Sequence, residues 1–147
     1  MDARQILERM TALCSRSECC PGDVRAKIEK LASSCEEPVD VDGMMKTLQD
    51  EGYLNENRYS EAFACDKAYL DGWGPAKISF ALRGKGVSSR AIDDALSQID
   101  VEKAGERLKK LLEVKSRSLE GDSQKKLKLI KFALSRGYGY DQIKSLL

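Results

Sequence analysis

Apolar residues recur every three or four positions along almost the whole chain, a spacing that predicts helices rather than strands. Ile92, Ala95, Leu96 and Ile99, for example, share one face of a helix. Glycine and proline residues interrupt this pattern and mark the turns. The predicted helices span residues 3–14, 21–32, 41–51, 56–70, 76–85, 89–99, 101–118, 123–136 and a short C-terminal segment. The predicted fold class is therefore all-α.

The stretch from Asp71 to Leu96 contains two short helices joined by a glycine turn, and the rest of the chain repeats this unit. A shift of 51 positions brings Gly86 onto Gly137, and a shift of 50 in the other direction brings Ile78 onto Ile28. Periods of about fifty residues are typical of arrays of similar helical units. We predict three tandem three-helix repeats, residues 1–52, 53–99 and 100–147, in an elongated, curved array.

Local signals predict how individual helices begin, end and pack. Asn55 is a suitable N-cap, and Gly86 and Gly137 are expected to adopt positive φ after a last helical turn. The helix 56–70 is expected to pack through Tyr59, Ala62, Phe63, Tyr69 and Leu70. Trp73, the only tryptophan, suits either a packing anchor between helices or an exposed platform for a base, and we favour the anchor.

The two halves of the chain carry opposite charges, although the formal net charge is only +1. Residues 1–70 contain 9 Lys and Arg against 14 Asp and Glu, whereas residues 71–147 contain 16 against 10. A chain polarised in this way can turn its basic half toward a polyanion. For any single lysine, a solvated helix face is the simpler interpretation.

Several classes of function find no support in the sequence. The chain has no histidine, and its five cysteines show no Cys-x-x-Cys spacing, so we expect reduced cytosolic thiols and no metal site. Without histidine or a glycine-rich phosphate loop, nothing indicates an enzyme or a cofactor. No apolar run approaches the roughly 20 residues of a membrane span, and the charged start resembles no signal peptide. A cytoplasmic protein without membrane contacts is expected.

Four short motifs stand out along the chain: Leu54–Phe63, Trp73–Ile78, Ala81–Val87 and the turn Arg136–Tyr138. They resemble motifs of the RecX family, bacterial regulators of the RecA recombinase. The resemblance covers most of the chain and is strongest over residues 48–96. Two departures concern the helix 56–70: Glu56 stands where the family usually has Asp, and Lys67 is the only cation in residues 64–70, where basic residues are common.

The resemblance implies a regulator that binds RecA and RecA–DNA filaments. It would limit filament growth, ATPase activity, strand exchange and SOS co-protease activity, and thereby modulate recombination and DNA repair. Single- and double-stranded DNA would be bound without sequence preference and with strong salt dependence, by a monomer. The candidate contact residues are Arg58, Lys77, Arg83, Lys85, Lys125, Lys126, Lys128, Lys131 and Arg136.

For the lysines of helix 123–136 and for Arg58, the sequence also predicts the position or the partner of the side chain. On the helix 123–136, one stripe is expected to contain Lys125, Lys128 and Lys131. Lys126 is expected to lie beside this stripe. Apolar residues of this helix are expected on another face: Leu127, Ile130 and Leu134. Arg58 suits either an ion pair with Glu61 or Glu51, which we favour, or a contact to phosphate or a partner.

An alternative function is a helix-turn-helix transcriptional regulator, since helices 76–85 and 89–99 have about the right length. Leu82 counts against it, because a small residue is usual four positions before the turn glycine. Asp93 and Asp94 also count against it, because acidic side chains on the second helix would approach DNA phosphates.

Overall fold

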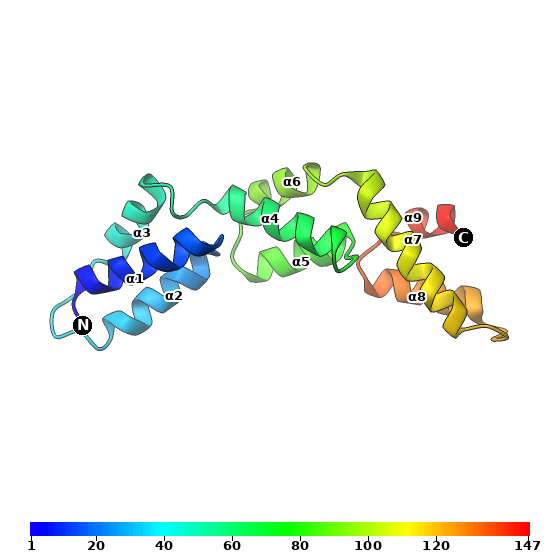
Figure 1. The fold of residues 1–147 in the computed structure, drawn as a ribbon, viewed down its shortest axis with the longest axis horizontal. Coiled ribbons are helices and arrows are strands. Elements are labelled where there is room, and N and C mark those ends of the chain that lie inside the picture. Colours follow the sequence, from blue (N-terminus) through cyan, green and yellow to red (C-terminus); the bar gives the residue numbers. More distant parts are fainter.

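The computed structural model of residues 1–147 consists of nine α-helices and contains no strand (Figure 1). The helices are α1 (Ala3–Arg16), α2 (Pro21–Ala32), α3 (Val41–Asp50), α4 (Glu56–Tyr69), α5 (Pro75–Gly84), α6 (Ser89–Ser97), α7 (Val101–Ser118), α8 (Lys125–Ser135) and α9 (Tyr140–Leu146). Each predicted helix is present, with ends that agree to within one turn. None of the nine combines the length and the apolarity needed to cross a bilayer.

Each group of three consecutive helices encloses its own hydrophobic core, and the groups follow one another in an elongated, gently arched row (Figure 1). The innermost residues are Ile6, Ile28 and Leu48 in the first core, Ile78, Leu82 and Ile92 in the second, and Leu108, Ala133 and Ile143 in the third. The predicted array of three-helix repeats is confirmed. Leu54 packs in the first core and Ala104 against the second, so the proposed boundaries at residues 52 and 99 stay a prediction.

The second helix of every repeat buries an i, i+4 pair, and these pairs define the register of the repeats. They are Val24 and Ile28 on α2, Ile78 and Leu82 on α5, and Leu129 and Ala133 on α8. Since α2 and α5 also begin with Pro21 and Pro75, the first two repeats align with a shift of 54. The alignment of Ile78 with Ile28 is therefore wrong by one helical turn. Residues i and i+4 share a face, which is why the apolar pattern alone did not separate the two alignments.

The buried face of α4 consists of small residues, which corrects the prediction from the sequence. Ser60, Ala64 and Ala68 are buried, whereas Leu70 is exposed. Of the other predicted residues, Ala62 is exposed and Tyr59, Phe63 and Tyr69 lie half-buried at the margin of the core. The reason is the close packing of α4 on α6, which itself presents Ala91 and Ala95. Large side chains would hold the two helices apart.

The second and third repeats are joined through backbone hydrogen bonds at the start of α5. The N–H of Gly74 donates to the carbonyl of Arg136 at 2.6 Å, and the N–H of Ala76 donates to the carbonyl of Gly137 at 3.1 Å. A Cβ atom on Gly74 would lie 2.5 Å from the Gly137 carbonyl oxygen, and Gly137 has φ 93. This approach therefore requires glycine on both sides, and it holds α8 and α5 head to tail.

The joint between the first and second repeats uses the corresponding elements but is looser and more polar. The Cys20 Sγ atom lies 3.6 Å from the carbonyl oxygen of Lys85, and the Lys85 ammonium lies 3.3 Å from a carboxylate oxygen of Asp23. Gly86 has the predicted positive φ, 79, but nothing lies within 4 Å of the position its Cβ would occupy. Here side chains, rather than paired backbone groups, hold α5 and α2 together.

Arg58 strengthens this first joint from α4. Its guanidinium forms an ion pair with Glu18, in the loop before α2, and donates to the carbonyls of Gly52 and Tyr53. The expected partners, Glu61 or Glu51, are thus wrong. The structural role favoured for Arg58 is present, but it links two repeats instead of stabilising one helix.

Candidate polyanion-binding edge

The second helices α2, α5 and α8 lie along one long edge of the array, the lower edge in Figure 1. Around α5, residues 72–92 contain four cations and no carboxylate, and around α8, residues 123–140 contain five cations and no carboxylate. The head-to-tail joint places these two segments directly after one another. The molecule therefore presents two adjoining helices of purely positive charge, in a chain whose total charge is close to zero.

The outward side of each second helix carries three residues at i, i+3 and i+6, opposite its buried pair. On α5 they are Lys77, Phe80 and Arg83, and at the equivalent positions of α8 they are Lys128, Lys131 and Leu134. We call these six residues, with Lys125 and Lys126 at the start of α8, the cationic edge. The equivalent residues of α2 are Asp23, Ala26 and Glu29, so the edge does not continue into the first repeat.

Five of the nine candidate cations have no carboxylate partner within salt-bridge distance and no hydrogen bond to the backbone. They are Lys77, Arg83, Lys125, Lys126 and Lys131, and all five belong to the cationic edge. Lys125 and Lys126 lie in the first turn of α8, which contains no acidic residue. Because the N-terminus of a helix is itself positive, these two charges add to the local potential instead of neutralising it.

The other four candidates make ion pairs or backbone hydrogen bonds inside the molecule. Arg58 and Lys85 support the first joint, as described above. The pKa of Lys85 is raised by the nearby Tyr59 hydroxyl and by its hydrogen bond to Asp23. Lys128 pairs with Asp122 and lowers the pKa of that carboxyl. The Arg136 guanidinium donates to the carbonyl of Asp71 at 3.2 Å, across the second joint.

Trp73 lies between two lysines at the margin of the second core. The ammonium groups of Lys67 and Lys77 lie 4.7 and 4.5 Å from its ring centre, and the Phe63 ring meets it edge-on at 6.3 Å. The indole is half-buried and packs against the second core. These contacts favour the packing role of Trp73 over that of a free platform for a base.

The structure adds a residue that the sequence analysis did not single out. Phe80 is the most exposed aromatic side chain, at 78%, and it stands at the centre of the outward side of α5. The position of the buried pair Ile78 and Leu82 would have revealed this, since residue 80 lies between them on the opposite face. In α8 the i, i+3, i+7 spacing of Leu127, Ile130 and Leu134 concealed that Leu127 and Leu134 are exposed.

In α8, the predicted separation of lysine and apolar faces is wrong. Leu129 and Ala133 form the buried side, while Leu127 and Leu134 are exposed beside Lys131. Of the predicted lysine stripe, Lys128 and Lys131 are exposed and Lys125 is half-buried. The outward side of α8 is therefore mixed, with apolar and cationic side chains interleaved.

The cysteines lie apart from this edge, and all five are free thiols. Cys14 is buried at the end of α1, and burial together with the neighbouring Cys19 thiol raises its pKa to about 12. Nowhere do three or more cysteine or carboxylate side chains converge in a way that could hold a metal ion.

The central repeat matches a family model described as the second three-helix domain of RecX, over residues 55–96. A regulatory protein RecX of Ectopseudomonas mendocina is 32% identical over 108 residues, which are 73% of this chain and 71% of that protein. The chain belongs to the RecX family. RecX of Clostridium perfringens strain 13 is 36% identical over 122 residues, 80% of this chain and 57% of the relative.

The chain spans about half the length of several curated RecX relatives that it matches; for that of Clostridium botulinum strain Eklund 17B, 40% identical, the share is 48%. Two solved structures share the fold. RecX from Lactobacillus salivarius superimposes with a TM-score of 0.85 at 21% identity, over 98% of this chain and 93% of that one. Another regulatory protein RecX gives 0.83 at 22% identity, over 98% and 70%.

The RecX family model covers only one of the two parts of the cationic edge. Residues 55–96 include Lys77, Phe80 and Arg83, so the α5 part lies inside the segment that the family model describes. The α8 part lies outside it. The similar relatives are named regulatory proteins, and this chain is accordingly assigned to a family of regulators.

Proposed function

We propose that this protein regulates the RecA recombinase by binding RecA filaments on DNA. In doing so it would limit filament growth, ATPase activity, strand exchange and SOS co-protease activity. The observation that carries the DNA part of this proposal is the cationic edge, two adjoining helices without a carboxylate in an otherwise balanced chain. Membership of the RecX family supports RecA as the protein partner.

Three cations of the cationic edge can contact an incoming phosphate without a competing carboxylate. Lys77, Arg83 and Lys131 are not neutralised by a neighbouring carboxylate, so bringing a phosphate to them breaks no internal ion pair. Lysine offers phosphate a point charge and no geometry that distinguishes bases, so the contact is independent of sequence. Each phosphate contact releases counterions, so binding weakens steeply as salt increases.

The first repeat has a different part in the proposal. On α2 the outward positions that correspond to Lys77 and Arg83 are Asp23 and Glu29. Both carboxylates are paired, with Lys85 and Arg25, so a phosphate backbone that followed the lower edge would meet no unpaired cation at these two positions. We therefore expect DNA along the second and third repeats, and the first repeat to contact the protein part of a filament.

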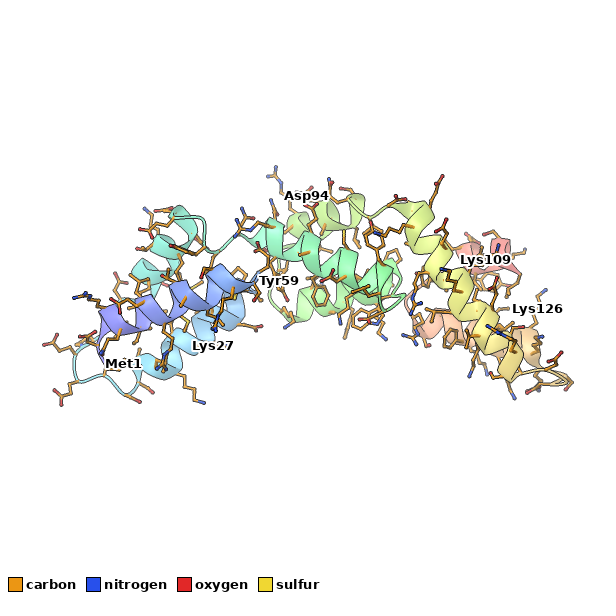
Figure 2. All side chains as sticks on the ribbon, in the orientation of Figure 1. Met1, Lys27, Tyr59, Asp94, Lys109 and Lys126 are labelled. Atoms are coloured by element: carbon orange, nitrogen blue, oxygen red, sulfur yellow. The ribbon has the colours of Figure 1, made fainter.

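The arrangement does not favour a sequence-specific helix-turn-helix regulator. Asp93 and Asp94 are exposed on α6, which would be the recognition helix, and Figure 2 shows Asp94 on the upper edge, away from α5. The basic helices and the acidic helix thus lie on opposite edges. A protein that reads the major groove through α6 would bring these carboxylates against phosphate.

A matched pair of triple variants tests the proposal. Lys77, Arg83 and Lys131 are changed to glutamate in one, and the exposed, unpaired Arg9, Lys27 and Lys30 of the first repeat in the other. Both variants have the same net charge. RecA ATPase on single-stranded DNA is measured at sub-stoichiometric amounts of each protein. We expect the first variant to lose inhibition and DNA binding, and the second to inhibit like the wild type. Equal inhibition by both folded variants would disprove a role for the cationic edge.

A further inference from the structure

Phe80 has no structural task that explains its exposure. It lies on the side of α5 opposite the buried pair Ile78 and Leu82 and is absent from the second core. The residue is 78% exposed, in contrast to Tyr59, Phe63 and Trp73, which all pack against that core. An isolated exposed apolar residue is ordinary on a protein surface. Phe80 differs from such a residue because cations flank it on the same side of the helix.

Both neighbours of Phe80 along the outward side of α5 are cations. Lys77 precedes it by three residues and Arg83 follows it by three, so each lies about one turn away on the helix surface. No carboxylate occurs between residues 72 and 92 to neutralise them. The Arg83 guanidinium makes only one hydrogen bond, to the hydroxyl of Ser79 at 3.4 Å, and four of its five donors stay free.

An aromatic ring at this position occurs only in the second repeat. The equivalent residue is Lys131 on α8 and Ala26 on α2. The position therefore tolerates a charge or a methyl group, and neither the helix nor the joint between repeats requires a ring. The α5 part of the cationic edge combines two cations with a flat apolar surface, whereas the outermost residue of α8 adds only a charge.

We propose that Phe80 stacks on an unpaired base of single-stranded DNA whose flanking phosphates are held by Lys77 and Arg83. This inference rests on the proposed DNA contact of the cationic edge. It adds that the contact of α5 prefers single strands over duplexes. A single strand can turn a base face toward the ring, and aromatic stacking of this kind is insensitive to sequence. In a duplex the base faces are occupied by neighbouring bases, so the ring gains no stacking partner there.

The test uses three labelled probes of equal length: a thymidine 20-mer, a 20-mer of abasic sites and a 20-base-pair duplex. The proteins are the wild type, Phe80→Ala, Phe80→Trp and the charge variant Lys77→Glu with Arg83→Glu. Affinities are measured by fluorescence anisotropy at one salt concentration. Since Phe80 is outside the core, its replacement is expected to leave the melting temperature unchanged, and a thermal melt of each variant verifies this.

We expect Phe80→Ala to weaken binding of the thymidine strand by about fivefold to a hundredfold, the range for loss of a stacking aromatic. Its affinities for the abasic strand and for the duplex should stay within twofold of the wild type. Phe80→Trp should restore or exceed wild-type affinity for the thymidine strand. The double charge variant should weaken binding to all three probes, because all three carry phosphates.

Other outcomes overturn the inference and separate it from the proposed function. If Phe80→Ala binds the thymidine strand as the wild type does while the charge variant fails on all probes, the cationic edge stands and the stacking role is wrong. If Phe80→Ala keeps all DNA affinities but no longer inhibits RecA ATPase, the ring contacts protein instead of a base. If the wild type binds none of the probes, DNA binding by the cationic edge fails, and the stacking role fails with it.

Discussion

The backbone N–H of Ala76 donates a 3.1 Å hydrogen bond to the carbonyl oxygen of Gly137, so the first turn of α5 is capped by the turn that ends α8. The N-terminal N–H groups and C-terminal carbonyls of helices normally lack partners within their own helix. Here N–H groups at the start of α5 donate to carbonyls at the end of α8, so groups of both helix ends find partners. The contact fixes the two basic helices end to end, and the continuity of the cationic edge depends on it.

Gly137 and Gly86 occupy equivalent turns but should respond differently to substitution. Both have positive φ, so alanine should cost about 1–2 kcal/mol at either position through the backbone alone. At Gly137, however, a Cβ would also lie 2.5 Å from the backbone nitrogen of Lys77, whereas at Gly86 it would meet nothing. Urea unfolding should therefore show a clearly larger loss of stability for Gly137→Ala than for Gly86→Ala. Equal losses would mean that the backbone around Gly137 and Lys77 moves apart without a loss of stability.

Ser60 provides a test of the packing on the buried face of α4. Its hydroxyl is buried and has no hydrogen-bond partner. Since an unpaired buried hydroxyl is unfavourable, Ser60→Ala should leave the free energy of unfolding unchanged or raise it by up to about 1 kcal/mol. The reverse change one turn away, Ala64→Ser, should lower it by about 1–3 kcal/mol. A marked destabilisation by Ser60→Ala would indicate that the hydroxyl is satisfied in solution.

The ion pair between Arg58 and Glu18 is expected to contribute unequally from its two ends. Both side chains are partly exposed, so the pair itself should be worth less than about 1 kcal/mol. Arg58→Ala also removes hydrogen bonds to the carbonyls of Gly52 and Tyr53, whereas Glu18→Ala does not. A double-mutant cycle by urea unfolding should give a small coupling energy and a larger single effect for Arg58. Equal single effects would assign Arg58 no role beyond the pair.

Much of the fold followed from the sequence because helix boundaries depend on local residues. Asn55 caps α4, and Pro75 and Gly86 delimit α5 and its turn as predicted. The misassigned faces depend on neighbours that are distant in sequence. Ser60 and Leu134 are examples: α4 buries small residues because α6 lies close, and the buried side of α8 is set by contact with α7 and α9. Neither contact leaves a periodic signal in the helix concerned.

The candidate site was predictable in part for the same reason. The distribution of charge along the sequence located the basic half of the chain and all the cations of the edge. Which of the nine candidate cations are neutralised depends on tertiary contacts such as Arg58 with Glu18 and Lys85 with Asp23, which join different repeats. The exposure of Phe80 follows from the buried pair of α5, Ile78 and Leu82, whereas the charge pattern of the sequence gives no signal for an aromatic residue.

Cys14 should make the stability of the first repeat decrease at alkaline pH. Burial, with the neighbouring Cys19, raises its pKa from 9.0 to about 12. Between these values the unfolded chain releases the proton and the folded chain retains it, so stability falls as pH rises above 9. Cys14→Ala should reduce the loss of unfolding free energy between about pH 7 and about pH 10.5. Cys65→Ala, at a half-buried position on α4, is the control, and an equal reduction there would refute this assignment.

The internal pair between Lys128 and Asp122 predicts a variant with increased DNA affinity. Asp122 accepts hydrogen bonds from both the Lys128 ammonium and the backbone N–H of Gln124. Asp122→Asn keeps an oxygen for the Gln124 N–H but removes the charge that neutralises Lys128. If the cationic edge binds phosphate, the released lysine adds one contact.

Asp122→Asn should then tighten binding of a thymidine 20-mer at low salt and steepen the dependence of log affinity on log salt by about one contact. Lys131→Gln, which removes an unpaired cation from the same helix, should weaken binding and flatten that slope by a similar amount. Because the two changes shift net charge in opposite directions on one surface, they form an internally controlled pair. An unchanged slope in both variants would show that α8 lies away from the DNA, and that α5 alone contacts the phosphates.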